Sequence, residues 1–495
     1  MAAYKWMVLS NTTIGSLMAA IDSSIVLISL PTILQQLPGT GVGEGIWIIM
    51  SYQLVTATLL LNFGRLGDIF GRVKMYNIGF AIFTVGSLLC SISETGIELV
   101  IFRLVQALGS ALLWANAAAI ITDAFPVNER GRALGINQIA IVAGSVVGLV
   151  LGGILTVTLG WRSIFWVNVP IGIFGTIWAH KKLKELANIK RGQKLDIPGN
   201  ITFVLGLTLI LIGVTFGSLS GWSNLILALL GLGGVLLVGF LYIETKVPEP
   251  MFHLVLFKNR VFAAGNVSAF LIALARGAFT FMMVFYLQGV LGYDALTAGI
   301  LLIPMSVAVS FFGPVSGWLS DKFGARLFAT AGLFVNGFAF LFMAQLPAGI
   351  SYYILVIPLI LFGTGIGLFS SPNRSETLSS VPASRRGVAS GTNSTLINVG
   401  MLLSLGLSIL IIAESVPHSV IVSVFGGVPP PANSAGAIDI ASFMLGLHTV
   451  YYLSALFCFA GMFPTLYGYR KAKEHRYGLT PTTVDEGSEE ELTNI

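Results

Sequence analysis

The sequence is poor in charged residues. Asp, Glu, Lys and Arg make up 10% of the 495 residues, whereas soluble proteins carry about 25%. Hydrophobic residues make up 55%, and the mean hydropathy is +0.87. This composition excludes an ordinary soluble enzyme of several domains, which the length alone would suggest. The net charge of +5 is too small an excess for a nucleic-acid-binding surface, so no nucleic-acid partner is expected.

The residues that build cofactor sites are also scarce. The two cysteines, Cys90 and Cys458, both lie in apolar runs, which excludes a disulfide framework and a thiolate metal site. The five histidines show no metal-ligand spacing, and no Gly-Lys dipeptide occurs, which excludes a phosphate-binding loop for ATP. We therefore expect no metal, no cofactor and no nucleotide. An ion gradient remains as the energy source, and a proton crossing 100 mV and one pH unit supplies about 3.7 kcal/mol.

Long apolar runs dominate what is present. A helix needs about 20 apolar residues to cross a bilayer, and fourteen runs reach that length. They are continuous and do not alternate, which favours helices over a barrel. The first run follows Lys5 without a small-residue cleavage site, which indicates a retained span and not a signal peptide. The runs cover residues 6–34, 45–64, 75–93, 98–121, 133–157, 162–181, 197–218, 222–243, 261–289, 296–318, 327–345, 351–372, 388–412 and 444–468.

Basic residues indicate the orientation of these spans. If the N-terminus is cytoplasmic, only Arg162 of the 27 Lys and Arg residues falls outside, and Arg103 and Arg276 lie within spans, which leaves 27 − 3 = 24 on the cytoplasmic side. Such an asymmetry is typical of multi-pass proteins. We therefore predict a plasma-membrane protein with an even number of spans and both termini in the cytoplasm.

An internal repeat divides the chain. The loop GRLGDIFGRVK (Gly64–Lys74) and the loop GWLSDKFGAR (Gly317–Arg326) share the pattern Gly-x-Leu-x-Asp-x-Phe-Gly, 317 − 64 = 253 residues apart. Two such loops on one membrane side predict two parallel helix bundles. We expect a six-helix bundle in residues 1–182, a loop with two inserted helices in 183–260, a second six-helix bundle in 261–468, and a disordered acidic cytoplasmic tail in 469–495. The predicted gating residues of the two loops are Gly64, Asp68, Gly71, Arg72, Gly317, Asp321, Gly324 and Arg326.

Further motifs identify a family. They are IDSSIVLISLP (21–31), RLVQALGSALL (103–113), GWRSIFWVNVPIG (160–172) and the fifth-span glycines Gly135, Gly144, Gly148, Gly152 and Gly153. With the two repeat loops, they make the sequence resemble the major facilitator superfamily, and within it the fourteen-helix drug:proton antiporters. The sequence departs from the family pattern at Ile69, Ala107 and Leu149, where the family usually has a base, Gly and Pro. The resemblance implies an all-α fold of two six-helix bundles plus two inserted helices. It also implies that Gly144, Gly148, Gly152 and Gly153 limit proton leak, although plain helix packing explains them equally well.

Three ionisable residues lie deep within spans, where each is costly. Asp22 lies well inside the first span, and desolvation there favours its protonated form unless a cation is nearby. It is the predicted proton carrier, with a permanently paired structural acid as the alternative. Arg103 shares a helix face with Ala107, Ser110 and Trp114. The resemblance implies that Arg103 couples proton movement to transport, and snorkelling to the interface is the alternative.

Arg276 is not required by any motif. The repeat offset gives 276 − 253 = 23, one position from Asp22, so the two halves place opposite charges at nearly equivalent sites. Arg276 therefore pairs with Asp22, binds an anionic substrate, or only stabilises one resting conformation. Together with Trp114, Met18 and Met283, it is predicted to line a substrate cavity.

These observations predict a proton-coupled exporter of small amphipathic compounds that works by alternating access. An exporter or flippase of an endogenous anionic metabolite or lipid is the alternative, favoured by Arg276. A membrane enzyme or receptor would need a catalytic cluster or a sensory domain, and the sequence contains neither. The expected partners are a small-molecule substrate, protons and the lipid bilayer, and we expect a monomer.

Overall fold

The computed structural model describes residues 2–126, 129–186, 196–248, 250–382, 385–425 and 434–469. These residues form helices and connecting turns, and no strand occurs among them. Thirteen helices in the described ranges are long and apolar enough to cross a membrane. The predicted sixth span is divided between two shorter helices, α6 and α7, and brings the number to fourteen. The predicted all-α membrane fold is therefore confirmed, while the predicted acidic tail lies outside the described residues beyond Tyr469.

Seven helices form the N-terminal bundle. Its strongest contacts join α3 to α4, α1 to α5, and α2 to α4. Pro170 lacks the N–H that would bond the carbonyl of Trp166, and the sixth span breaks at Val167 and restarts at Asn168. The helices are α1 (Ala2–Gln36), α2 (Val42–Phe70), α3 (Arg72–Ser91), α4 (Gly96–Ala124), α5 (Arg130–Leu159), α6 (Ser163–Trp166) and α7 (Asn168–Lys182).

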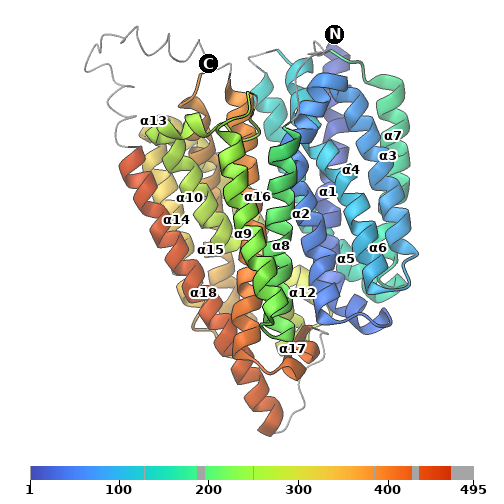
Figure 1. The fold of residues 1–495 in the computed structure, drawn as a ribbon, viewed down its shortest axis with the longest axis vertical. Helices are drawn as coiled ribbons and strands as arrows, with labels where there is room; N and C mark the ends of the chain where they lie inside the picture. Colours follow the sequence, from blue (N-terminus) through green and yellow to red (C-terminus); the bar gives the residue numbers. More distant parts are fainter. Residues whose placement is uncertain are drawn as a thin grey trace.

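The inserted pair, α8 (Ile197–Ser220) and α9 (Asn224–Glu244), forms a hairpin. Helix α8 contacts α2 of the first bundle and α16 (Arg386–Ser415) of the second. The Asn200 side-chain amide donates to the carbonyl of Thr58 at 3.5 Å, and Leu211 lies beside Gly406. The hairpin therefore lies across the junction of the two bundles (Figure 1).

The C-terminal bundle contains more interrupted helices than the sequence predicts. The ninth predicted span breaks at Gly277–Ala278, and the tenth breaks at Leu302, before Pro304. A short outer helix, α17, was not predicted. The elements are η1 (Leu254–Lys258), α10 (Arg260–Arg276), α11 (Phe279–Phe285), η2 (Tyr286–Val290), α12 (Ala295–Leu301), α13 (Ile303–Phe323), α14 (Ala325–Met343), α15 (Tyr352–Ser379), α16, α17 (His418–Phe425) and α18 (Ser434–Gly468).

The start of α1 and the end of α18 lie at the same end of the molecule (Figure 1). At the opposite end the two bundles pack tightly. The Gln288 side-chain amide donates to the carbonyl of Ile28 at 3.0 Å, and a Cβ added at Gly299 would come within 2.6 Å of the Leu149 carbonyl oxygen. Toward the first end of α5, by contrast, Gln138 and Ile139 are exposed. The bundles are therefore closed against each other at the end remote from the N-terminus.

Candidate functional site

The two predicted coupling residues form a buried ion pair. Arg103 of α4 donates from Nη1 to Oδ2 of Asp22 in α1 at 2.6 Å. Asp22 is 0% exposed and Arg103 is 2% exposed. A charge pair so far from water is costly to form and costlier to break on one side only.

Amides complete the coordination of the Asp22 carboxylate. Its Oδ1 accepts one bond from Gln106 Nε2 and one from Asn168 Nδ2, both at 2.8 Å. Gln106 also donates to Ser87 Oγ at 2.6 Å. Asn168 begins α7, directly after the interruption at Val167, and its side chain contacts α1. The Asp22 carboxylate therefore accepts hydrogen bonds from three side chains, and both of its oxygens face donors. An ionised carboxylate, which only accepts hydrogen bonds, fits this arrangement.

Arg103 has further contacts besides its ion pair with Asp22. Its Nη1 also donates to Gln106 Oε1 at 2.6 Å, and its Nε donates to the carbonyl of Ile48 at 3.3 Å. The guanidinium lies 4.2 Å from the centre of the Tyr52 ring, a cation–π contact. The Tyr52 hydroxyl donates to Ser110 Oγ at 2.6 Å. The guanidinium is therefore fixed in orientation by contacts from α1, α2 and its own helix.

The fifth-span glycines fall into two groups. Cβ atoms added at Gly144, Gly148 and Gly152 would come within 3.0, 2.7 and 3.0 Å of backbone oxygens of α1. A Cβ at Gly153 would instead come within 2.4 Å of the Leu296 Cα in α12 of the other bundle. Gly135 has no neighbour within 4 Å. Helix α5 therefore contacts the Asp22 helix on one face and the opposite bundle on another.

The first repeat loop holds an ionic network. Arg72 bonds Asp68 (Nε to Oδ1, 2.9 Å) and Asp123 of α4 (Nη1 to Oδ1, 2.8 Å). Gly71 ends α2 with φ of 103°, a conformation that favours glycine. A Cβ at the neighbouring Gly67 would collide with Asn116 Oδ1, whereas Gly64 is open. This loop therefore ties α2, α3 and α4 together.

The second repeat loop has the same backbone but different side-chain contacts. Gly324 ends α13 with φ of 89°, the counterpart of Gly71. A Cβ at Gly317 would come within 2.6 Å of Ser371 Oγ in α15. Asp321 and Arg326 are both exposed, and within the described part of the chain neither forms an ion pair. Both copies of the repeat therefore share the glycine that ends the helix, whereas among the described residues only the first copy forms ion pairs.

The predicted cavity residues occupy different environments. Arg276 ends α10 immediately before the helix break and is partly exposed, as is Trp114. The nearest side-chain partner of Arg276 is Met401, with Nη2 and Sδ 4.0 Å apart, and among the described residues no carboxylate pairs with it. Met18 and Met283 are 1% and 0% exposed, so they line no open space in this conformation. The assignment of all four to a substrate cavity stays a prediction.

Three uncharged residues of the site, Gln106, Asn168 and Tyr52, were not predicted. Gln106 follows Arg103 by three positions and so shares its helix face. Asn168 lies two residues before Pro170, at a position where a helix can begin. A search of the apolar runs for amide side chains would have included both Gln106 and Asn168. The cation–π contact of Tyr52 has no such signal, because it depends on how α2 is rotated against α4.

Comparisons with known proteins identify the family. The family model described as "Major Facilitator Superfamily" matches residues 12–405. The chain belongs to the major facilitator superfamily. Its predicted resemblance is thereby confirmed, and the protein is a multi-pass membrane transporter with a small-molecule substrate. The fold and the family are those of transporters and not of enzymes.

The relatives in this superfamily are named for the transport of different compounds. The "Riboflavin transporter RibZ" of Clostridioides difficile is 32% identical over 467 residues, which cover 94% of this chain and 98% of that protein. "Multidrug resistance protein 3" of Bacillus subtilis is 29% identical, over 89% of this chain and 85% of that protein. A solved bacterial homologue of the human lysosomal transporter Spinster superposes with a TM-score of 0.67 at 16% identity, over 94% of this chain and 97% of that one. That superposition supports the fold alone.

Proposed function

We propose that this transporter exports small amphipathic compounds in exchange for protons, by alternating access of its two bundles in the plasma membrane. Relatives named as multidrug resistance proteins support the efflux assignment. The observation that carries the coupling assignment is the buried carboxylate of Asp22, held by Arg103, Gln106 and Asn168. Among the described residues of the first bundle, Asp22 is the only fully buried acid, so it is the one that we assign to proton uptake.

Protonation of Asp22 would disturb a satisfied network. A protonated carboxyl group carries a donor, and its donor would face Arg103 or the two amides, which are donors themselves. Arg103 would keep its charge without a counter-ion, in a site that water does not reach. That state is costly, and movement that admits water or substrate relieves it. Uptake of a proton therefore favours a different arrangement of the helices around Asp22.

Helix α5 is the connection to the rest of the molecule. It contacts α1 through Gly148, whose Cβ would meet the carbonyl of Ile21, the residue before Asp22. Through Gly153 it contacts Leu296 of α12. A shift of α1 on protonation would therefore move the contact that closes the bundles against each other. Alternating access requires that the contact between α5 and α12 exist in two arrangements, one closed and one open.

The orientation and assembly belong to the same proposal. The end that carries both described termini also carries most basic residues and is assigned to the cytoplasm. The tight α1–η2 and α5–α12 contacts then close the outer side in this conformation. The protein works as a monomer, with residues 1–182 and 261–468 as the two moving units and 183–260 between them.

Transport in proteoliposomes tests the proposal. The purified protein is reconstituted, a pH gradient is imposed, and accumulation of a fluorescent amphipathic cation is followed together with internal pH. Exchange predicts that substrate addition moves protons in the opposite direction and that an uncoupler abolishes accumulation. Accumulation that is insensitive to the pH gradient and to the uncoupler would exclude proton coupling.

A second function is favoured by Arg276. Arg276 is a partly exposed residue within a span, beside a helix break and with no carboxylate partner among the described residues, and such an arginine is suited to an anion. Export or flipping of an anionic metabolite or lipid is therefore the alternative. Proton-driven accumulation of anionic but not cationic probes would decide for it.

A further inference from the structure

A pocket separate from Asp22 opens between α3 and α7, at the end of the bundle where the chain begins. Its volume is about 450 Å³. The two helices that line it, α3 and α7, lie at the lateral edge of the molecule, away from the α8–α9 hairpin at the junction of the two bundles (Figure 1). The residues that line it are Val73, Lys74, Asn77, Ile78, Ala81, Thr176, Ala179, His180, Leu183 and Glu185.

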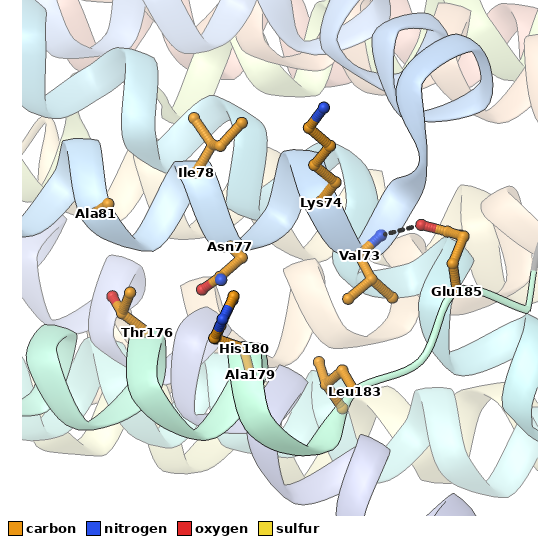
Figure 2. Close-up of a pocket in the computed structure, with 10 residues that line it drawn as sticks. All are labelled: Val73, Lys74, Asn77, Ile78, Ala81, Thr176, Ala179, His180, Leu183 and Glu185. Atoms are coloured by element: carbon orange, nitrogen blue, oxygen red, sulfur yellow. Dashed lines mark hydrogen bonds between the residues drawn. The ribbon is translucent and has the colours of Figure 1, made fainter.

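One part of this pocket is cationic. Lys74 of α3 and His180 of α7 are both exposed at its rim, and Lys181 and Lys182 follow in the last turn of α7. Glu185 also lies at the rim, but its Oε2 accepts the backbone N–H of Val73 at 2.9 Å (Figure 2). That bond caps the start of α3 and directs the carboxylate toward the helix N-terminus. The basic side chains therefore outnumber the single acid around the opening.

The depth of the pocket holds an amide oxygen that has no partner in the described part of the chain. Asn77 of α3 and His180 of α7 face each other across the pocket (Figure 2). The Asn77 Oδ1 atom is buried and has no hydrogen-bond donor among the described residues. A buried unsatisfied acceptor is unfavourable, and a ligand with a hydroxyl group would supply the missing donor.

The other part of the pocket continues into an apolar surface. Ile78 is 38% exposed, and Phe174 and Ile177 on α7 are 54% and 49% exposed. In a membrane protein, such side chains on the outer face of a bundle contact acyl chains. The pocket therefore joins a basic opening at the membrane surface to a lipid-facing groove.

We propose that this pocket binds an anionic phospholipid from the leaflet at that surface. The phosphate lies beside His180 and is reached by the flexible side chain of Lys74, which extends from the other side of α3 (Figure 2). A hydroxyl of the headgroup donates to Asn77, and an acyl chain follows Ile78. Basic pockets between transmembrane helices on the cytoplasmic side are suited to anionic headgroups. The site is adjacent to the ionic network of Arg72, so its occupant also stabilises the start of α3.

Native mass spectrometry of the purified protein tests this assignment. Phosphatidylglycerol is titrated against phosphatidylcholine, and the apparent dissociation constant of the tightest-bound lipid is measured. Lys74→Gln and His180→Gln should each weaken phosphatidylglycerol about fivefold, as expected for one basic residue at a membrane surface. Glu185→Gln should strengthen it by a similar factor, because the amide oxygen still accepts the Val73 N–H while the negative charge is gone.

Matched controls separate this site from a general attraction to basic surface. Lys322 lies at the same end, on α13 of the other bundle, and Lys322→Gln should leave the tightest-bound lipid unchanged. Ala81→Leu, which reduces the pocket without changing charge, should remove that lipid. Equal weakening by Lys74→Gln and Lys322→Gln would overturn the proposal. Displacement of phosphatidylglycerol by millimolar glycerol phosphate would also overturn it, in favour of a site for free phosphate. The Asp22 mechanism is unaffected by either outcome.

Discussion

Gly148 of α5 lies against the carbonyl oxygen of Ile21, so closely that a Cβ at position 148 would come within 2.7 Å of it. Ile21 immediately precedes Asp22, the acid that we assign to proton coupling. The absence of a side chain at position 148 therefore sets the position of the Asp22 backbone relative to α5. The contact also shows which substitution would change that distance without touching a charged group.

Gly148→Ala should force α1 and α5 apart and destabilise the protein by about 1–3 kcal/mol, since the colliding atom is backbone. Gly135→Ala is the matched control on the same helix, because Gly135 has no neighbour within 4 Å. Both native cysteines are buried, so a thiol-reactive dye reports unfolding during heating. Equal melting temperatures for the two variants would mean that α5 tolerates a side chain at the Ile21 contact.

Asp22→Asn should abolish accumulation against a gradient while leaving substrate binding and downhill exchange. The amide cannot change charge, and its oxygen still accepts from Gln106 or Asn168. Because Arg103 loses its counter-ion, the variant should also be less stable than the unaltered protein, so thermal unfolding first establishes that it is folded at the assay temperature. Glu94→Gln makes the same charge change at an exposed position and serves as the control. Proton-driven accumulation in proteoliposomes is the measurement. An Asp22→Asn variant that concentrates substrate as the unaltered protein does would refute the assignment.

Arg103→Ala should be strongly destabilising, by about 3–5 kcal/mol, because it leaves the buried Asp22 carboxylate without a counter-ion. The double variant Asp22→Asn with Arg103→Ala should be less unstable than the sum of the two single variants. Thermal unfolding of the four proteins gives the coupling energy. Strict additivity would mean that the pair contributes no direct interaction to stability.

Arg276→Gln should raise the Michaelis constant for anionic substrates about tenfold or more, the loss expected for a hydrogen bond to a charged group. Cationic substrates should be unaffected and provide the internal control. If Arg276 pairs with Asp22 in another conformation, the effects of Arg276→Gln and Asp22→Asn on transport should be non-additive. Additive effects with no change in substrate preference would leave Arg276 a structural residue only.

Cysteine labelling should confirm the orientation. A cysteine at Gly349, in the loop that contains Gln345, should react with an impermeant maleimide in intact cells. A cysteine at Leu186, which follows α7 and is exposed, should react only after permeabilisation. The buried Cys90 and Cys458 give little background. The reverse pattern would place both termini outside and would reassign the pocket between α3 and α7 to the outer leaflet.

Most of the fold could be predicted because a bilayer leaves few choices. Backbone polar groups in lipid must bond within their own segment, so each long apolar run becomes a helix. The helix interruptions were harder to predict from the sequence. Those before Pro170 and Pro304 follow from a missing N–H, whereas the break at Gly277 depends on its contact with Met401 and on the Ser404 hydroxyl that accepts the Ala278 N–H at 3.0 Å.

The sequence by itself determined the number of spans, the repeat, the family and the three ionisable residues that lie at depth. These depend on composition and spacing along one chain, and the cost of an isolated charge in lipid applies in any arrangement of helices. Only the tertiary structure decided that Asp22 pairs with Arg103 and not with Arg276, and that Gln106 and Asn168 complete its coordination. Which side chains meet depends on how each helix is rotated and how deeply it lies. Nearly uniform hydrophobicity around each helix leaves both undetermined until the helices pack.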